Sequence, residues 1–432
     1  MRHLRGVLLT VLTSSSAALA AAERFPSPEF ESGYHLPQII TPGPRAALYS
    51  YIDIAVLVAV LLLGAWFSIR KRSRRDIVVL VIFSALYFGF YRRGCICAVG
   101  AIQNVALALG DPGYMLPLAA GAFFVLPLLA ALVWGRVFCA AACPLGALQD
   151  LVVLRPVRVP IWLERTLGLI PFVYVGLAVL LAWTNSRFII CEWDPFIAFF
   201  RLAGPGLIIG IGAGLLVIGM FVGRPYCRYL CPLMPLLRAC GRVAWSPPRL
   251  VEDDCIRCNL CADACPFNAI APPTPDNALP RPREGRTLLM AQLIVLPLII
   301  ALGGWLGYEG SHMLSRVNPT IRLAERVWAE QQGTVEGTTE QSDAFYHLGE
   351  PNEGLYRQAG EIRHRFDIGS TILGAWLGLV IGLGLVANTI RRRRTDYEID
   401  PAACVACGRC YHVCPVQRAR EKQATNADVV SQ

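Results

Sequence analysis

Long apolar runs separated by short arginine-rich segments make up most of the chain. A helix needs about 20 predominantly apolar residues to cross the roughly 30 Å hydrocarbon core of a bilayer. Runs that reach or approach this length lie at 51–69, 77–91, 114–134, 166–184, 204–222, 288–307 and 370–390. The pattern predicts a mainly α-helical fold, a polytopic transmembrane bundle of about seven spans.

The basic residues set the expected orientation of these spans. Arg2 and Arg5 precede a short apolar stretch and the small residues Ala18-Leu-Ala20, which is the pattern of a signal peptide over residues 1–22. An uncleaved anchor is the alternative. Arginine clusters follow the first span, separate the third from the fourth and follow the last, and such clusters stay in the cytoplasm. We therefore expect a multi-pass protein of the bacterial inner membrane, with its N-terminus periplasmic after signal cleavage and its C-terminus cytoplasmic.

Composition narrows the classes of function. Of 432 residues, 55% are hydrophobic and only 16% are charged, which excludes an ordinary soluble enzyme. The net charge is +9, but the basic residues lie beside apolar runs and not on one soluble face, so we expect no nucleic-acid partner. The six histidines fall in the signal peptide, loops or tails, where they do not offer the paired ligands of an intramembrane haem. The sixteen cysteines remain as the candidate chemistry.

Two cysteine runs have the spacing of bacterial ferredoxins, C-x2-C-x2-C-x3-C followed by proline, and thiolates at this spacing hold a [4Fe–4S] cluster. Disulfides are disfavoured on the reducing cytoplasmic side, and zinc sites prefer paired C-x2-C groups at longer intervals. In two-cluster ferredoxins the fourth cysteine of each run ligates the other run's cluster. We therefore predict two [4Fe–4S] clusters, one held by Cys255, Cys258, Cys261 and Cys414 and the other by Cys404, Cys407, Cys410 and Cys265.

Two further segments are copies of one motif, Gly-Arg-x2-Cys-x3-Cys-Pro. They contain Cys139 and Cys143 in the first copy and Cys227 and Cys231 in the second. The C-x3-C spacing puts two thiols on one helical face, and the expected topology puts all four at the cytoplasmic membrane edge. The sequence leaves three interpretations open: an additional iron–sulfur or metal site, a redox-active dithiol pair, or simple packing.

A degenerate third copy of the motif contains Cys95 and Cys97, with Arg93 in the place of the first cysteine. By the same topology these two thiols and Cys191 are expected at the outer face. They are candidates for a cofactor site, a disulfide or packing. Cys240 has no partner pattern and is expected to be a buried bystander.

The spans and motifs together divide the chain into six regions. They are a signal peptide (1–22), a periplasmic segment (23–50), a transmembrane core with the C-x3-C-P repeats (51–245), a first ferredoxin half (246–287), a transmembrane hairpin (288–390) with a periplasmic loop (308–369), and a second ferredoxin half with the C-terminal tail (391–432). The periplasmic loop is acidic, and residues 318–328 are expected to form an amphipathic helix there.

With these motifs the chain resembles the membrane polyferredoxins of the NapH and NosR type, over residues 50 to 415. We expect it to lack the large periplasmic flavin-binding domain of the NosR type. The resemblance implies electron transfer between the quinone pool and a redox partner, with no substrate conversion of its own. It implies respiratory or periplasmic partner subunits, such as a c-type cytochrome or a quinone oxidoreductase, and a bound quinone.

Clusters confined to the cytoplasmic face do not reach an outer partner across roughly 30 Å of hydrocarbon. The expected order is therefore an outer site near Cys95, Cys97 and Cys191, then the C-x3-C-P repeats, then the two ferredoxin clusters. The chain is expected to be an electron-transfer subunit of an oxidoreductase complex rather than a stand-alone enzyme. The alternative is a maturation factor that reduces a metal or disulfide for a partner enzyme.

Overall fold

The computed structural model describes residues 47–94, 97–154, 156–157, 159–250, 255–274, 282–349, 351–389 and 394–420. The predicted signal peptide, nearly all of the predicted periplasmic segment, and Cys95 lie outside the described residues.

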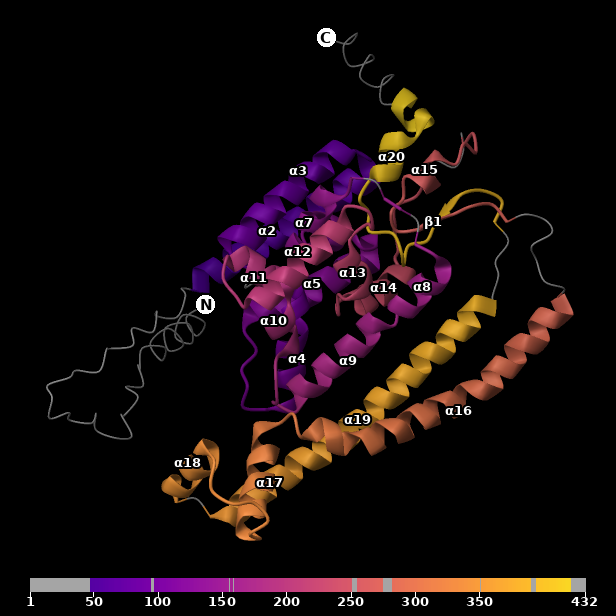
Figure 1. Ribbon diagram of the computed structural model, residues 1–432. Coiled ribbons are helices and arrows are strands. Elements are labelled where there is room, and N and C mark those ends of the chain that lie inside the picture. Colours follow the sequence, from indigo (N-terminus) through magenta and orange to yellow (C-terminus); the bar gives the residue numbers. More distant parts are fainter. Residues whose placement is uncertain are drawn as a thin grey trace, which may run out of the picture. The chain divides into compact units, whose positions relative to one another are not determined.

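The described chain is mainly helical, as predicted (Figure 1). Before the first ferredoxin half it forms α2 (Ala47–Ala65), η2 (Trp66–Arg70), α3 (Arg74–Ser84), η3 (Ala85–Tyr91), α4 (Ala98–Gly110), α5 (Leu118–Trp134), α6 (Val137–Ala141), α7 (Pro144–Val152), α8 (Ile161–Leu167), α9 (Ile170–Trp183), α10 (Ile189–Trp193), α11 (Pro195–Arg201), α12 (Gly206–Gly219), α13 (Pro225–Tyr229) and α14 (Met234–Arg242). From there on it forms α15 (Leu260–Asp263), β1 (Ile270–Ala271), α16 (Pro282–Ser315), α17 (Pro319–Gln331), α18 (Glu340–Leu348), α19 (Asn352–Thr389), β2 (Glu398–Ile399) and α20 (Arg409–Val413).

Among the described residues, four helices are long and apolar enough to cross a membrane: Leu48–Arg70, Trp162–Trp183, Arg286–Ser315 and Asn352–Ala387. Helices α11 and α12 add a fifth if this pair, bent by 103°, counts as one span. Helices also occupy the predicted spans 77–91 and 114–134. They are not counted as candidate spans, because α3 begins with three charged residues and α5 has only 17 residues. A membrane protein is thus confirmed, whereas the count of seven spans and their orientation stay predictions.

The transmembrane core contains short helices as well as spans. Helices α6, α7, α10, α11, α13 and α14 have five to nine residues each. Proline begins α7, α11 and α13, a position where its missing N–H costs nothing, and Gly135 (φ 74°) and Arg224 (φ 51°) reverse the backbone before α6 and α13. Such breaks at membrane depth are tolerated only inside protein. The short helices accordingly contribute many residues to the largest buried cluster of the described chain.

The two ferredoxin halves meet although about 140 residues separate them in sequence. Strand β1 pairs antiparallel with β2, with Ile270 opposite Ile399, and the Asp400 N–H donates to the Ala269 carbonyl at 2.7 Å. Helix α15 contacts α20. The prediction that one module is built from two separated segments therefore agrees with the structure.

Helices α16 and α19 form a long hairpin that packs through glycines (Figure 1). Gly303 and Gly307 on α16 face Gly374 and Gly378 on α19, and a Cβ at any of them would overlap backbone atoms of the other helix. Small residues spaced by four are the usual means by which membrane helices approach closely.

The amphipathic helix predicted over 318–328 is confirmed as α17. The side chain of Asn318 caps it by accepting from the Thr320 N–H at 2.9 Å. Its buried face packs with α18, α19 and the end of α9 in a second apolar cluster.

The glycine contact predicts a difference between two matched substitutions in α16. In Gly307→Leu the new side chain meets the Ser370 carbonyl, whereas nothing lies within 4 Å of a Cβ at Gly310. Because both changes raise helix propensity equally, the difference reports packing, and overpacking costs about 1–3 kcal/mol. We expect the apparent unfolding temperature in detergent to fall for Gly307→Leu and not for Gly310→Leu. Equal unfolding temperatures for the two variants would show that the hairpin does not depend on this contact.

Candidate iron–sulfur site

The two ferredoxin runs fold into the same loop. Arg257 and Asn259 lie two and four residues after Cys255, and Ala406 and Gly408 lie two and four residues after Cys404; all four have positive φ, between 53° and 72°. Residues in this left-handed region turn the chain tightly. The Ala406 N–H consequently donates to the Cys404 Sγ at 3.4 Å, the kind of hydrogen bond to sulfur that tunes a cluster's potential.

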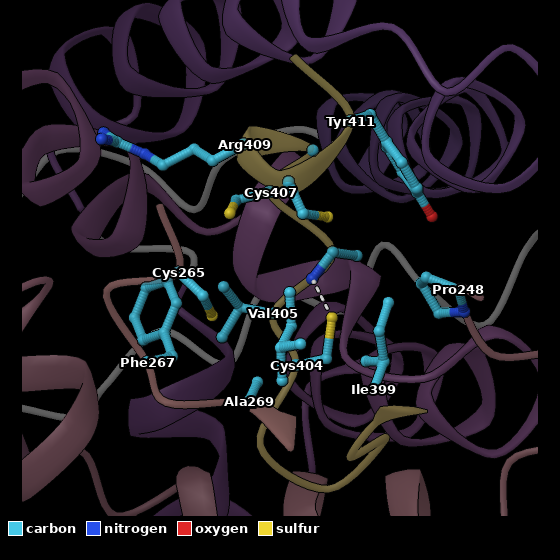
Figure 2. Close-up of a pocket in the computed structure, with 14 residues that line it drawn as sticks. Pro248, Cys265, Phe267, Ala269, Ile399, Cys404, Val405, Cys407, Arg409 and Tyr411 are labelled. Carbon is cyan, nitrogen blue, oxygen red and sulfur yellow. Dashed lines mark hydrogen bonds between the residues drawn. The ribbon is translucent and has the colours of Figure 1, made fainter. Parts of the chain in front are cut away.

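Four ferredoxin cysteines surround one cavity, and they come from both runs (Figure 2). Cys404, Cys407 and Cys410 belong to the second run, and the fourth thiol is that of Cys265 from the first. Apolar side chains close the cavity, among them Phe267 and Val405. The donor set fits a [4Fe–4S] cluster, and it is the crossed set that the sequence predicts for the second cluster.

The polypeptide alone does not favour charged thiols in this cavity. Burial raises the pKa of Cys404 to about 12, and burial likewise raises the pKa of Cys265 and that of Cys410. Metal coordination deprotonates a thiol. Cluster binding at this cavity therefore releases protons.

The first cluster's predicted ligands are only partly gathered. Cys255 and Cys258 lie within electrostatic range of Cys261, and Cys258 is exposed. The place of Cys414 as their fourth ligand stays a prediction. Among the described residues, no three His, Cys, Asp or Glu side chains lie close enough to share one metal ion, but a cubane binds each thiolate through a different iron, so its ligands need not converge on a point.

The C-x3-C-P cysteines gather in the transmembrane core. Cys139, Cys143, Cys227 and Cys231 are all at most 8% exposed, and each of the others lies within electrostatic range of Cys143. The prediction that each pair lies on one helical face is wrong. A residue before proline disfavours helical backbone, so Cys143 is extended (ψ 114°) and α6 ends before it; in the other copy, α13 ends before Cys231.

The thiols expected at the outer face adjoin this group. Cys97, at the start of α4, lies within electrostatic range of Cys143, Cys231 and Cys191. We expected the outer thiols to lie far from the C-x3-C-P thiols. They do not, because the broken helices bring Cys97 into the core beside Cys143 and Cys231. Cys191 itself is exposed, and Cys240 is half-buried.

Buried arginines lie between the core thiols and the ferredoxin loops. Arg136 donates to the Ala402 carbonyl at 3.2 Å and approaches the Cys139 Sγ at 3.9 Å. Arg224, fully buried, donates to the Cys139 carbonyl, and its guanidinium stands 5.8 Å from the centre of the Phe267 ring. The Nε atoms of both arginines are buried without a hydrogen-bond partner in the part of the chain that the structure describes. Unpaired cationic donors beside thiols fit an anionic thiolate or cluster at this place.

Asp150 joins the ferredoxin module to the core. Arg74, Arg409 and Arg224 approach its carboxylate to 2.6, 3.4 and 3.5 Å. Burial alone would raise the pKa of Asp150, but the three guanidiniums outweigh it and hold the pKa at about 2. Arg74 also donates to the Cys407 carbonyl at 2.8 Å, and Arg409 lies between Cys407 and Cys410 in the second run. The sequence reading missed Asp150 and these arginines, although Arg136 and Arg224 recur at one motif position.

Comparisons with known proteins agree with these sites. One model of a 4Fe–4S binding domain matches residues 116–170 and 203–245, which contain the four C-x3-C-P cysteines, and a second model of a 4Fe–4S binding domain matches 248–271 and 397–417. No solved structure matches the chain.

Three relatives illustrate the range of the similarity. Regulatory protein NosR of Stutzerimonas stutzeri is 29% identical over 51% of this chain and 33% of its own length. YccM of Escherichia coli (strain K12), named for electron transport, is 28% identical over 30% of this chain and 41% of its own. The methylamine utilization ferredoxin-type protein MauN of Paracoccus denitrificans (strain Pd 1222) is 28% identical over 37% of this chain and 62% of its own. The chain spans a third of the NosR protein's length.

Ligation of one cluster by cysteines of both runs predicts how much iron a double cysteine variant loses. Cys258→Ala removes a ligand of the first cluster and Cys265→Ala a ligand of the second, so the double variant should lose about eight iron atoms, the content of two [4Fe–4S] clusters. If each run ligated its own cluster, both single changes would affect the same cluster and the double variant would lose only about four. Iron counting with EPR separates the two cases, and Cys240→Ala serves as the control that retains all iron.

Proposed function

We propose that this chain, a membrane 4Fe–4S ferredoxin-type protein of the NosR and NapH type, relays electrons between the quinone pool or a periplasmic redox partner and [4Fe–4S] clusters on the cytoplasmic side. In this proposal it acts as a subunit of a respiratory complex. An iron–sulfur electron-transfer role is supported by the matching 4Fe–4S domains and the relatives' names.

The observation that carries the proposal is a series of thiols in one buried cluster, which contains Cys139, Cys143, Cys227, Cys231 and Cys407 and packs against Cys97, Cys265 and Cys404. It begins at the exposed Cys191 and passes through Cys97 to Cys143 and Cys231, which adjoin Cys139 and Cys227. Arg224 lies within range of Cys139, Cys227 and Cys407, and so connects the core with the ferredoxin cavity. A protein that only stored clusters on one face would not need such a series.

The chain's own residues have three tasks in such a relay. A bound iron–sulfur cluster accepts and returns an electron. The cysteines hold that group in place, the apolar helices exclude water around it, and Arg136 and Arg224 offset negative charge at the thiols beside them. Guanidinium remains protonated under all conditions of interest, so these two residues supply a fixed positive field.

The alternative, reduction of a metal or disulfide during maturation of a partner enzyme, finds support only in the exposure of Cys191. Thiol–disulfide exchange needs direct access of one sulfur to another, and the C-x3-C-P thiols are buried. Native purification distinguishes the two roles: a stoichiometric complex with a respiratory partner supports the relay, and isolation of a lone subunit supports the maturation role.

Removal of the middle of the series tests the relay. In lipid nanodiscs, a double variant with Cys139→Ser and Cys227→Ser should keep both ferredoxin clusters, as seen by EPR. An added quinol should reduce these clusters much more slowly than it reduces those of the unmodified protein. Cys240→Ser, which changes a cysteine outside the series, should react like the unmodified protein. Unchanged cluster reduction in the double variant would contradict the relay.

A further inference from the structure

Two helices of the core carry the same seven-residue pattern. Residues 97–103 read Cys-Ala-Val-Gly-Ala-Ile-Gln at the start of α4, and residues 143–149 read Cys-Pro-Leu-Gly-Ala-Leu-Gln at the start of α7. In both, cysteine caps the helix, and the glutamine six residues later, Gln103 or Gln149, is completely buried. The copy that begins at Cys231 has Leu237 in the place of the glutamine.

The two glutamines make equivalent contacts. Gln149 Oε1 accepts from the Tyr226 N–H at 3.0 Å, and Gln103 Oε1 accepts from the Ile190 N–H at 3.0 Å. Tyr226 and Ile190 are each the second residue of a five-residue helix, and each directly precedes a cysteine, Cys227 in α13 and Cys191 in α10. Neither helix has a side-chain cap of its own. Each glutamine therefore supplies from another helix the acceptor that the helix start lacks.

The glycines of the pattern each adjoin a cysteine of another helix, although the two cysteines are not equivalent: Gly100 adjoins Cys191 of α10 and Gly146 adjoins Cys139 of α6. A Cβ at Gly100 would stand 3.3 Å from the Cys191 Sγ, and one at Gly146 would meet the Cys139 carbonyl oxygen at 2.6 Å. A side chain at position 146 would therefore displace backbone, whereas one at position 100 would press on the Cys191 thiol.

These contacts make α10 the counterpart of α13. Cys191 corresponds to Cys227. Asp194-Pro195 follows Cys191 after two residues, and Cys231-Pro232 follows Cys227 after three, so α10 is one residue shorter than the other copy before its proline. The sequence alone does not reveal this relation because α10 has no C-x3-C motif. The core therefore contains two equivalent units, Cys97 with Cys191 and Cys143 with Cys227.

The amide nitrogens differ between the units. Gln149 Nε2 donates to the Cys227 Sγ at 3.3 Å. Gln103 Nε2 is buried and has no hydrogen-bond partner among the residues that the structure describes. A buried donor without an acceptor is costly, so this nitrogen is suited to a sulfur of a group bound at Cys97 and Cys191.

We propose that Gln103 and Gln149 are equivalent positioning residues in a duplicated thiol core. Each fixes the short helix that carries the second cysteine of its unit, and each donates its amide hydrogen to a sulfur of that unit. That both units are redox sites rests on the proposed function. That the glutamines position the two short helices does not depend on the proposed function.

Hydrogen exchange tests the positioning role without any electron transfer. In the full-length protein, Gln149→Leu should make the amides of residues 226–229 exchange roughly fivefold faster, as expected for one lost hydrogen bond, and leave those of 189–193 unchanged. Gln103→Leu should do the reverse. Asn104→Leu changes the neighbouring amide on α4, which hydrogen-bonds Gly100 and Tyr114, and it should change neither segment.

The acid variants separate the two roles of each amide. Gln149→Glu and Gln103→Glu keep the accepting oxygen, so protection from exchange should return, but they lose the N–H donor. The reduction potential of a centre in that unit, measured by EPR titration, should then fall in both the acid and the leucine variants. Exchange that rises equally in both segments, or in neither, would overturn the proposal. If exchange changes only in the expected segment but electron transfer is unimpaired in all four variants, the duplicated core is supported and the proposed electron relay is contradicted.

Discussion

The contact between Asp150 and its three arginines is the constraint on which the arrangement of redox sites depends. One buried carboxylate faces guanidiniums from α3, from the start of α13 and from the second ferredoxin run. Removal of one partner of a buried ion pair typically costs about 3–5 kcal/mol, because the remaining charge is left uncompensated. The ferredoxin module therefore cannot shift on the core without leaving charges buried and unpaired.

The same network carries more positive than negative charge. Three arginines surround one aspartate, and the buried Arg136 adds a guanidinium at Cys139, the residue whose carbonyl Arg224 also contacts. Neutral thiols do not balance this surplus, whereas thiolates bound to iron do. The arginines thus favour anionic sulfur on both sides of them, a bound cluster in the Cys404 cavity and deprotonated thiols in the core around Cys139. Their backbone contacts at Ala402 and Cys407 hold these places close together.

Local patterns predicted part of this structure. Apolar runs lie in helices at every expected position, and the ferredoxin spacing predicted that Cys265 joins the second run's thiols. The breaks in the core were missed because hydrophobicity does not register them, although the residue-before-proline rule applies directly at Cys143. The arginine contacts were not predictable, since they join residues as far apart as Arg74 and Cys407. The glycine spacing of the α16–α19 hairpin is visible in the sequence, but the pairing of the two helices is seen only in the structure.

Electron exchange between the core and the Cys404 cavity tests the central claim most directly. Asp150→Asn keeps the size of the side chain and removes the charge that attracts the three arginines, whereas Asp396→Asn breaks only the exposed ion pair with Arg257, which is worth about 0–1 kcal/mol. Freeze-quench EPR follows the reduction of the ferredoxin clusters after a quinol is added. We expect slower reduction in Asp150→Asn, with all clusters retained, and an unchanged rate in Asp396→Asn. Equal rates in the two variants and the unmodified protein would contradict it.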